Sequence, residues 1–287
     1  MRKLSLIILM FLFANLIAAK MVNDNWFTFF VGQGCPALQA IPLPVTHHQL
    51  VIIAHRGSHM NVPENTLAAY EAAIKDGTDY VEIDLRTTKD GYLVIMHDES
   101  VTKMTRRKEL IKDLSYSEIK DLKIKPVREK DITTYRIPEF ASVLNLCKGR
   151  INIYLDFKDA DVAKTYKLIK EAGMQNNVVV YLNKEEQYGQ WKKIAPSMPL
   201  MASLPENASD LQLDNFLDKV HLNVVDNAYS ADQLSRMHKR NIAVWLDVQS
   251  KDEGPAKWEQ ALKQGADGLQ TDHPEKLIKY LESRGIR

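Results

Sequence analysis

From residue 50 onward the chain alternates short runs of β-branched and other apolar residues with longer amphipathic stretches. This alternation is typical of repeated strand–helix units, in which the strands form a parallel sheet and the helices cover it. The runs predicted to be strands are residues 51–54, 80–85, 151–156, 178–182, 200–202, 221–225, 243–247 and 268–270. So many units in 287 residues predict an α/β fold, a single TIM-type (β/α)8 barrel. An open doubly wound sheet fits less well, because the sequence has no glycine-rich phosphate loop.

Helical patterns fill several of the intervals, at residues 66–76, 163–172, 231–239 and 255–264. The first of them has Lys75 in its last turn and Gly77 just beyond its end, which are common helix stop signals. Residues 92–97 follow a turn signal and are predicted to be the return arm of a hairpin. Residues 99–140 are charged and contain no clear strand. We interpret them as a small insertion after the second strand, beside the mouth of the barrel.

The N-terminus has the layout of a secretory signal peptide. Arg2 and Lys3 precede an apolar run at residues 4–19, and polar residues follow it. The run is short for a membrane span, so we expect cleavage, export to the periplasm or the extracellular space, and no stable membrane span afterwards. A retained anchor is the alternative. The predicted organisation is a signal peptide at residues 1–20, a lead-in at residues 21–48 and a barrel domain at residues 49–287.

Composition excludes one large class of partner. The chain has 38 Lys and Arg residues against 37 Asp and Glu residues, so it has no net basic character with which to bind nucleic acid. A charged substrate must therefore be held by local groups. Two cysteines, Cys35 and Cys147, either form a disulfide in an exported protein or remain thiols.

Carboxylates cluster at the ends of the predicted strands. Glu82 and Asp84 alternate on the second strand and so point to the same face, while Asp156 ends the third. The carboxyl ends of the strands form the face on which such barrels build their active sites. Neighbouring carboxylates repel one another unless a positive charge lies between them. We therefore expect a hard divalent cation with oxygen ligands here.

Two histidines accompany these carboxylates. His55 follows the first strand, and His97 ends the hairpin arm. Phosphodiester cleavage needs a general base, a general acid and cations that offset the charge of the phosphoryl oxygens. Imidazoles suit the first two tasks because their pKa lies near neutrality. Lys158, two residues beyond Asp156, can hold a phosphate oxygen.

An ordered series of short motifs is more specific than any of these residues alone. The series is His55-Arg56-Gly57, Pro63-Glu64-Asn65-Thr66, Glu82-Ile83-Asp84, His97-Asp98, Gly265-Ala266-Asp267-Gly268 and Thr271-Asp272-His273-Pro274. In order and spacing it resembles the glycerophosphodiester phosphodiesterase family, and the resemblance covers the chain from about Val51 to its end.

This resemblance implies a barrel enzyme that binds Ca²⁺ or Mg²⁺. The implied substrates are small glycerophosphodiesters, such as glycerophosphocholine or glycerophosphoethanolamine, and the products are glycerol phosphate and an alcohol. The implied roles are an acid–base pair (His55 and His97), metal ligands (Glu64, Glu82, Asp84 and Asp156) and phosphate-binding residues (Arg56 and Lys158). Two positions depart from the family pattern. Asp156 is more often Glu there, and the shorter side chain lengthens the metal contact or inserts a water; His59 is an additional histidine with no assigned use.

Two further residues are candidates for substrate binding. Asn65 lies in the Pro-Glu-Asn-Thr motif, where capping the following helix is a competing role. Trp245, near the end of the seventh predicted strand, offers an aromatic face to a choline-like cation or else belongs to the core.

Two other functions share some of these features. A barrel phospholipase of the C or D type that acts on intact phospholipid also uses two histidines, but would carry exposed apolar loops for docking on a membrane. An exported binding protein would keep the barrel without its chemistry. The sequence itself indicates no particular oligomeric state.

Overall fold

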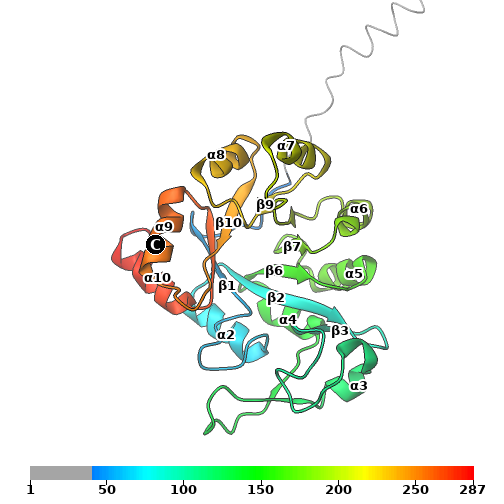
Figure 1. The fold of residues 1–287 in the computed structure, drawn as a ribbon. Helices are drawn as coiled ribbons and strands as arrows, with labels where there is room; N and C mark the ends of the chain where they lie inside the picture. Colours follow the sequence, from blue (N-terminus) through cyan, green and yellow to red (C-terminus); the bar gives the residue numbers. More distant parts are fainter. Residues whose placement is uncertain (1–40) are drawn as a thin grey trace, which may run out of the picture. The chain divides into compact units, whose positions relative to one another are not determined.

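The computed structural model describes residues 41–287, and these form a closed barrel (Figure 1). Its sheet has nine strands in the order β1-β11-β10-β9-β8-β7-β6-β2-β3, and β1 also pairs with β2, which closes the ring. All pairings are parallel except the one between β2 and β3. The barrel strands are β1 (Val51–Ala54), β2 (Tyr80–Thr87), β6 (Asn152–Phe157), β7 (Val178–Leu182), β8 (Leu200–Met201), β9 (Val224–Val225), β10 (Ala243–Asp247) and β11 (Gly268–Thr271). The predicted fold class is confirmed.

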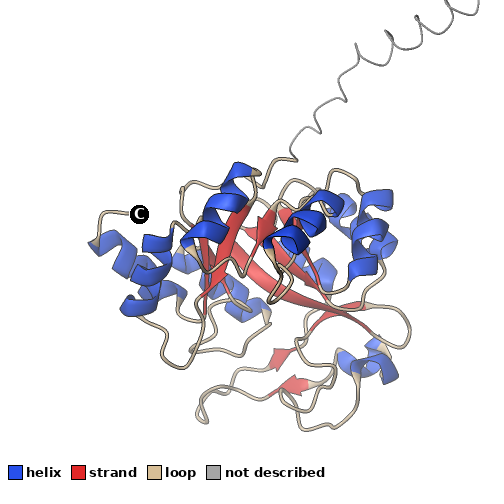
Figure 2. Ribbon diagram, turned by 45° about the horizontal axis from the view of Figure 1, so that its top comes forward, coloured by secondary structure: helices blue, strands red, loops and turns tan. Residues whose placement is uncertain are grey.

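Helices surround the barrel on its outside (Figures 1 and 2). They are α2 (Leu67–Asp76), α4 (Phe140–Cys147), α5 (Val162–Ala172), α6 (Glu185–Ile194), α7 (Asp210–Lys219), α8 (Ala231–Lys239), α9 (Pro255–Gln264) and α10 (Pro274–Ser283). Alternate strand residues, such as Ile52 and Ile83, pack outward against these helices in the main core. Residues of opposite orientation, such as Ile53, Tyr80 and Trp245, fill the inside of the barrel. Inward residues nearer the carboxyl ends of the strands are therefore the ones that can form a site.

The predicted and observed elements agree closely except at β9. This strand begins at Val224 rather than at residue 221. At residue 221 the backbone N–H donates to the hydroxyl of Tyr188 on α6 at 2.9 Å instead of to a neighbouring strand.

The stretch from residue 99 to residue 140 has more regular structure than its sequence indicates. The predicted hairpin is confirmed, with β3 (Leu93–Ile95) antiparallel to β2. The expectation that no strand follows was wrong, because β4 (Lys123–Ile124) pairs with β5 (Tyr135–Arg136), apart from the barrel sheet (Figure 2). A 3-10 turn, η1 (Ile111–Asp113), and a short helix, α3 (Tyr116–Ile119), complete the segment. These pieces enclose an apolar cluster of their own, which two-residue strands need because they cannot be stable alone.

The part of the lead-in that the structure describes, residues 41–48, lies against the amino ends of the strands. The carbonyl oxygen of Pro44 accepts a hydrogen bond from the Tyr80 hydroxyl, and that of Val45 accepts one from the Asn152 amide. The predicted signal peptide and Cys35 lie outside the described residues, while Cys147 is buried in α4. Within residues 41–287, every helix is too short or too polar to cross a bilayer.

Candidate active site

A polar cavity of about 210 Å³ opens at the carboxyl ends of the strands. It brings together most of the residues predicted to form the site: His55, Arg56, Glu82, Asp84, His97, Asp156 and Lys158. Larger hollows of about 430 and 620 Å³ occur elsewhere, but neither combines paired histidines with grouped carboxylates. The chemistry therefore locates the site better than cavity size does.

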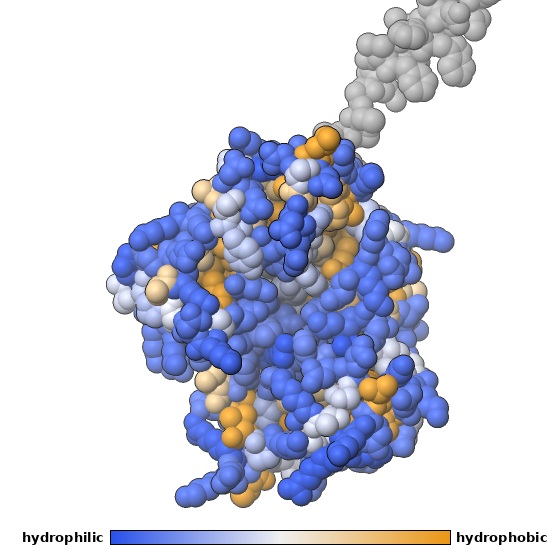
Figure 3. All heavy atoms as spheres, in the orientation of Figure 1, coloured by the Kyte–Doolittle hydropathy of each residue, from blue (hydrophilic) through white to orange (hydrophobic). Residues whose placement is uncertain are grey.

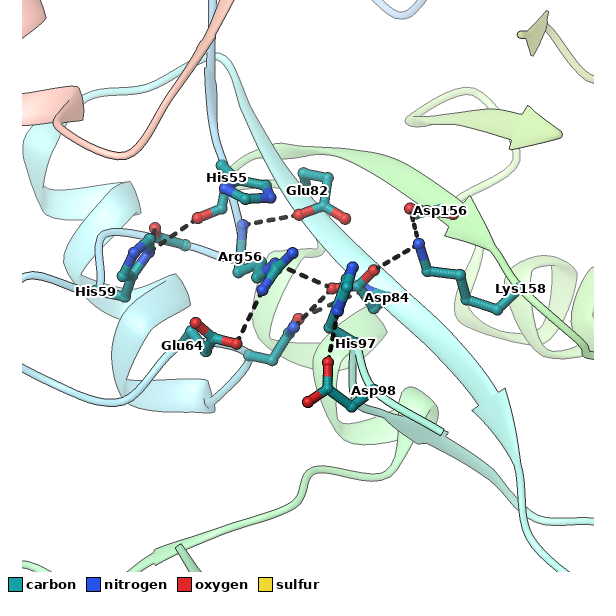
Figure 4. A network of polar contacts seen from close by, with 12 residues as sticks. His55, Arg56, His59, Glu64, Glu82, Asp84, His97, Asp98, Asp156 and Lys158 are labelled. Carbon is teal, nitrogen blue, oxygen red and sulfur yellow. Dashed lines mark hydrogen bonds and ion pairs between the residues drawn. The ribbon is translucent and has the colours of Figure 1, made fainter. Parts of the chain in front are cut away.

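Three carboxylates form one group in this cavity (Figure 4). Glu82 and Asp84 come from β2 and Asp156 from β6, where Asp84 and Asp156 are register partners. One oxygen of each lies within 4.8 Å of the others. Burial raises the pKa of Glu82 well above its ordinary value, and the charges of Asp84 and Asp156 raise it further. Close oxygens and mutual repulsion are the properties of a site for a hard divalent cation.

Two basic side chains flank the carboxylates. Nζ of Lys158 lies 3.1 Å from Oδ1 of Asp84 and also pairs with Asp156. Nε of Arg56 lies 3.5 Å from Oδ2 of Asp84. Burial alone would raise the pKa of Asp84, but these two cations outweigh that effect and lower it. Arg56 and Lys158 both line the cavity, so an anionic substrate there can replace the carboxylates as their ion-pair partner.

Each histidine is oriented by an aspartate. Nδ1 of His55 lies 2.7 Å from Oδ1 of Asp272, and Nδ1 of His97 lies 2.8 Å from Oδ1 of Asp98. An ionised carboxylate only accepts hydrogen bonds, so in both rings Nδ1 carries the proton and Nε2 remains for the cavity. Asp98 and Asp272 are functional residues that were not predicted from the sequence. The sequence did contain a signal for both aspartates, because each stands in one of the family motifs. Only the fold shows that Asp272 lies beside His55.

Glu64 lies outside the carboxylate group. Its Oε1 pairs with Nη1 of Arg56 at 3.0 Å (Figure 4). The same oxygen pairs with Nζ of Lys103 at 3.0 Å. Both cations bind the same oxygen, so Glu64 positions Arg56 in this structure, and its predicted role as a metal ligand stays a prediction. The additional histidine, His59, donates from Nδ1 to the carbonyl oxygen of His55 at 3.0 Å and so stabilises the same loop.

Asn65 contacts a metal-site carboxylate and not the cavity. It is 2% exposed, donates from Nδ2 to Oδ2 of Asp84 at 2.7 Å, and accepts from the Tyr70 hydroxyl at 2.8 Å. The cap of α2 is Thr66, whose hydroxyl accepts from the N–H of Ala69. The structure places Asn65 against Asp84, whose carboxylate it positions, while its predicted role in substrate binding stays a prediction.

Trp245 also lies away from the cavity. It is 1% exposed and packs inside the barrel on Tyr80 and Tyr154, with ring centroids 4.8 and 6.5 Å away. Trp245 and Asp247 both point into the barrel from β10. Trp245 lies nearer the amino end of the strand, in the interior core, whereas Asp247 lies nearer the carboxyl end and lines the cavity. The structure thus supports the core role for Trp245 and not the substrate role.

Gly57 permits the turn that presents His55 and Arg56. Its φ is +82°, and a Cβ at this position would lie 2.7 Å from the carbonyl carbon of Ala69. We expect Gly57→Ala to lower the free energy of unfolding by about 3 kcal/mol, because left-handed strain and a backbone clash add together. Gly149→Ala is the matched control, since Gly149 has φ +69° but open space around its Cβ position. Urea unfolding of both variants measures the free energy of unfolding of each. If both variants lose the same amount, the clash with Ala69 makes no contribution and the prediction is wrong.

Comparison with known proteins places these residues in a family. The model of the glycerophosphoryl diester phosphodiesterase family matches residues 55–276. A glycerophosphodiester phosphodiesterase of Caldanaerobacter subterraneus subsp. tengcongensis is 29% identical over 253 residues, which cover 82% of this chain and 99% of that protein. One from Bacillus altitudinis is 27% identical, covering 80% of this chain and 98% of that protein.

Solved structures share the fold. A glycerophosphodiester phosphodiesterase from Agrobacterium tumefaciens superposes with a TM-score of 0.71 at 24% identity, covering 80% of this chain and 99% of that one. A phosphodiesterase from Oleispira antarctica, in complex with the product sn-glycerol-3-phosphate, gives 0.69 at 21% identity, covering 81% and 96%. The segment that the family model matches begins at His55 and ends beyond the last barrel strand, so it contains every residue that lines the cavity. This chain therefore belongs to the glycerophosphoryl diester phosphodiesterase family.

Proposed function

We propose that this protein hydrolyses glycerophosphodiesters with the help of a divalent cation, Ca²⁺ or Mg²⁺, and of two histidines that exchange protons with the substrate. Family membership supplies the reaction class. One observation carries the finer assignment: a single cavity of about 210 Å³ is lined by both imidazoles and by the Glu82, Asp84 and Asp156 carboxylates.

Glu82, Asp84 and Asp156 would hold the cation. When bound, it offsets negative charge on the phosphoryl oxygens. Arg56 and Lys158 line the same cavity and neutralise the remaining phosphoryl charge, which orients the diester. These residues act as binding and electrostatic groups, and the proton transfers fall to the histidines.

The histidines divide the acid and base roles. Nε2 of one ring accepts the proton of the glycerol 2-hydroxyl, whose oxygen attacks phosphorus. A cyclic phosphate forms, and the bond from phosphorus to the alcohol oxygen breaks as the other ring protonates that oxygen. Water then opens the ring and leaves glycerol phosphate. Asp98 and Asp272 stabilise each ring as it becomes positively charged. The product in the Oleispira antarctica complex, sn-glycerol-3-phosphate, agrees with this scheme.

Stripping the protein of metal with a chelator tests the proposal. We expect hydrolysis of glycerophosphocholine, glycerophosphoethanolamine and glycerophosphoglycerol to fall about 100-fold or more, because cation stabilisation is worth several kcal/mol. Returning Ca²⁺, Mg²⁺ or Mn²⁺ restores the activity, measured as glycerol phosphate released. Full activity after stripping would contradict the metal role, and release of choline phosphate would show that the other ester bond breaks.

One observation favours a second candidate, action on intact phospholipid. Val127 and Ile132 project from the insertion with 51% and 97% of their surface exposed, as a docking loop requires. The face drawn in Figure 3 is otherwise mainly hydrophilic, with its apolar residues scattered. Adding phospholipid vesicles to the same panel separates the two functions, because a phospholipase turns over vesicles faster than it does the soluble diesters.

A further inference from the structure

The cavity has a second acidic wall that the proposed reaction does not use. Asp226 directly follows β9, and Asp247 ends β10. In the closed strand order, β9 lies across the barrel from β2, and β10 lies across from β6. Asp226 and Asp247 therefore line the cavity opposite the carboxylates of the metal site.

This wall has no counter-charge within the described residues. The groups that donate to it are neutral: the Ser203 hydroxyl to Oδ2 of Asp226 at 3.1 Å, and the Gln270 amide to Oδ1 of Asp247 at 2.8 Å. In the part of the chain that the structure describes, neither carboxylate has a Lys, Arg or His partner within 4.0 Å. Burial raises the pKa of Asp247 to about 7, and the charge of Asp226 adds to the shift. A cation from outside the chain would relieve this repulsion.

Unused hydrogen-bond acceptors accompany the missing charge. Oε1 of Gln270 and Oδ1 of Asp226 are buried and accept no hydrogen bond, although these residues are only 5% and 6% exposed. Oε1 of Gln249, on the same cavity, is also unpartnered. A buried acceptor without a partner destabilises the fold, so such atoms commonly mark the place where a donor binds. Within the described residues, the wall therefore has no positive partner, and three of its acceptor oxygens have no N–H or O–H donor.

We propose that Asp226, Asp247 and Gln270 bind the primary ammonium group of the substrate's alcohol moiety, so that the enzyme prefers aminoalkyl glycerophosphodiesters such as glycerophosphoethanolamine. This inference rests on the proposed function and adds its substrate class. A primary ammonium brings one positive charge and three N–H donors. A neutral polyol brings donors but leaves the charges uncompensated, and a quaternary ammonium brings charge but no donor.

A divalent cation is a weaker candidate for this wall. Such an ion needs several close oxygens. Within residues 41–287, the grouping of three carboxylates close enough to share an ion is Glu82, Asp84 and Asp156. Two carboxylates and an amide oxygen are enough for an ammonium group, which needs fewer oxygen partners than a divalent cation does.

The test compares kcat/KM for glycerophosphoethanolamine, its N-acetylated form, glycerophosphocholine and glycerophosphoglycerol, all at saturating metal. The wild-type protein is expected to favour the free amine at least tenfold over each of the other three. Asp226→Asn and Asp247→Asn keep the size of each side chain, and each is expected to shrink that preference at least fivefold, mainly through KM. Asp232→Asn, an exposed change on α8, is the matched control and keeps the preference.

Each outcome decides a different point. Equal loss on the amine and on glycerophosphoglycerol would overturn the proposal, because the acidic wall would then support the glycerol end or the fold. Wild-type protein that cleaves all four substrates equally well overturns the inference but leaves the proposed function standing. Wild-type protein that cleaves none of them refutes both. The N-acetyl comparison needs no variant, so the proposal stays falsifiable even if an Asn variant does not fold.

Discussion

Replacing either His55 or His97 by alanine lowers kcat for glycerophosphodiester hydrolysis by about 10³-fold, with KM changed by less than about threefold. The expected size follows from general acid–base catalysis, which contributes about 10²–10⁴. In the proposed mechanism the histidines act on protons in the transition state, whereas the cation, Arg56 and Lys158 bind the phosphate in the ground state as well. The loss therefore appears in kcat.

Steady-state kinetics on one glycerophosphodiester, at saturating metal, measures the effect. His221→Ala is the matched control, because His221 is exposed and remote from the cavity residues. The double variant is expected to be little worse than either single variant, since the two rings serve one step. Near wild-type turnover in either single variant would remove that histidine from the mechanism.

Replacing Glu82 by glutamine abolishes the stabilisation of the protein by Ca²⁺ or Mg²⁺ and lowers hydrolysis by about 10³-fold. Only the wild-type side chain brings a third negative charge to the group, so the variant binds the cation more weakly. By mass action, a ligand at 100 times its Kd stabilises the native state by about 2.7 kcal/mol, and the variant loses this gain. Thermal unfolding with and without metal measures the loss.

The metal-free proteins should differ in the opposite sense, and the difference depends on pH. Burial and the neighbouring carboxylates raise the pKa of Glu82 in the folded state above the ordinary value of 4.5. The unfolded chain then releases its proton first, so stability falls as the pH rises above 4.5. Glutamine has no such proton, and metal-free Glu82→Gln is expected to exceed metal-free wild type in melting temperature at pH 8 but not at pH 4.

Glu71→Gln controls for a simple loss of charge. Glu71 pairs with Arg150 at the surface and lies outside the cavity. A metal-induced rise in melting temperature that persists unchanged in Glu82→Gln would place the cation elsewhere.

Much of the barrel follows from local sequence, because each strand is a short apolar run between turn signals. The bounds of β1, β7 and β10 agree with the prediction to the residue. Prediction fails where a distant partner sets the backbone. The backbone of His221, which was expected in β9, binds Tyr188 instead, and β4 and β5 supply each other's hydrogen bonds over a shared apolar cluster.

The same distinction between local pattern and distant contact applies to the residues of the site. Strand alternation correctly groups Glu82 with Asp84, because a period of two is a local property. Alternation also puts Trp245 and Asp247 on the same inward face of β10. Their position along the barrel axis then decides that Trp245 is a core residue and that Asp247 lines the cavity. This position depends on the stagger of neighbouring strands, which the sequence of one strand does not encode.

The sequence by itself determined the class of fold and, through its ordered motifs, the family, and it supplied the side chains that we propose to be chemically active. The export signal that it indicates stays a prediction. The tertiary structure decided which of those side chains share a space: Asp272 meets His55 across 217 positions of sequence, Glu64 binds cations instead of joining the carboxylates, and Asp226 and Asp247 face them. The physical reason is that residue type and alternation are local, whereas burial, charge balance and hydrogen-bond partners are set by segments that meet only when the barrel closes.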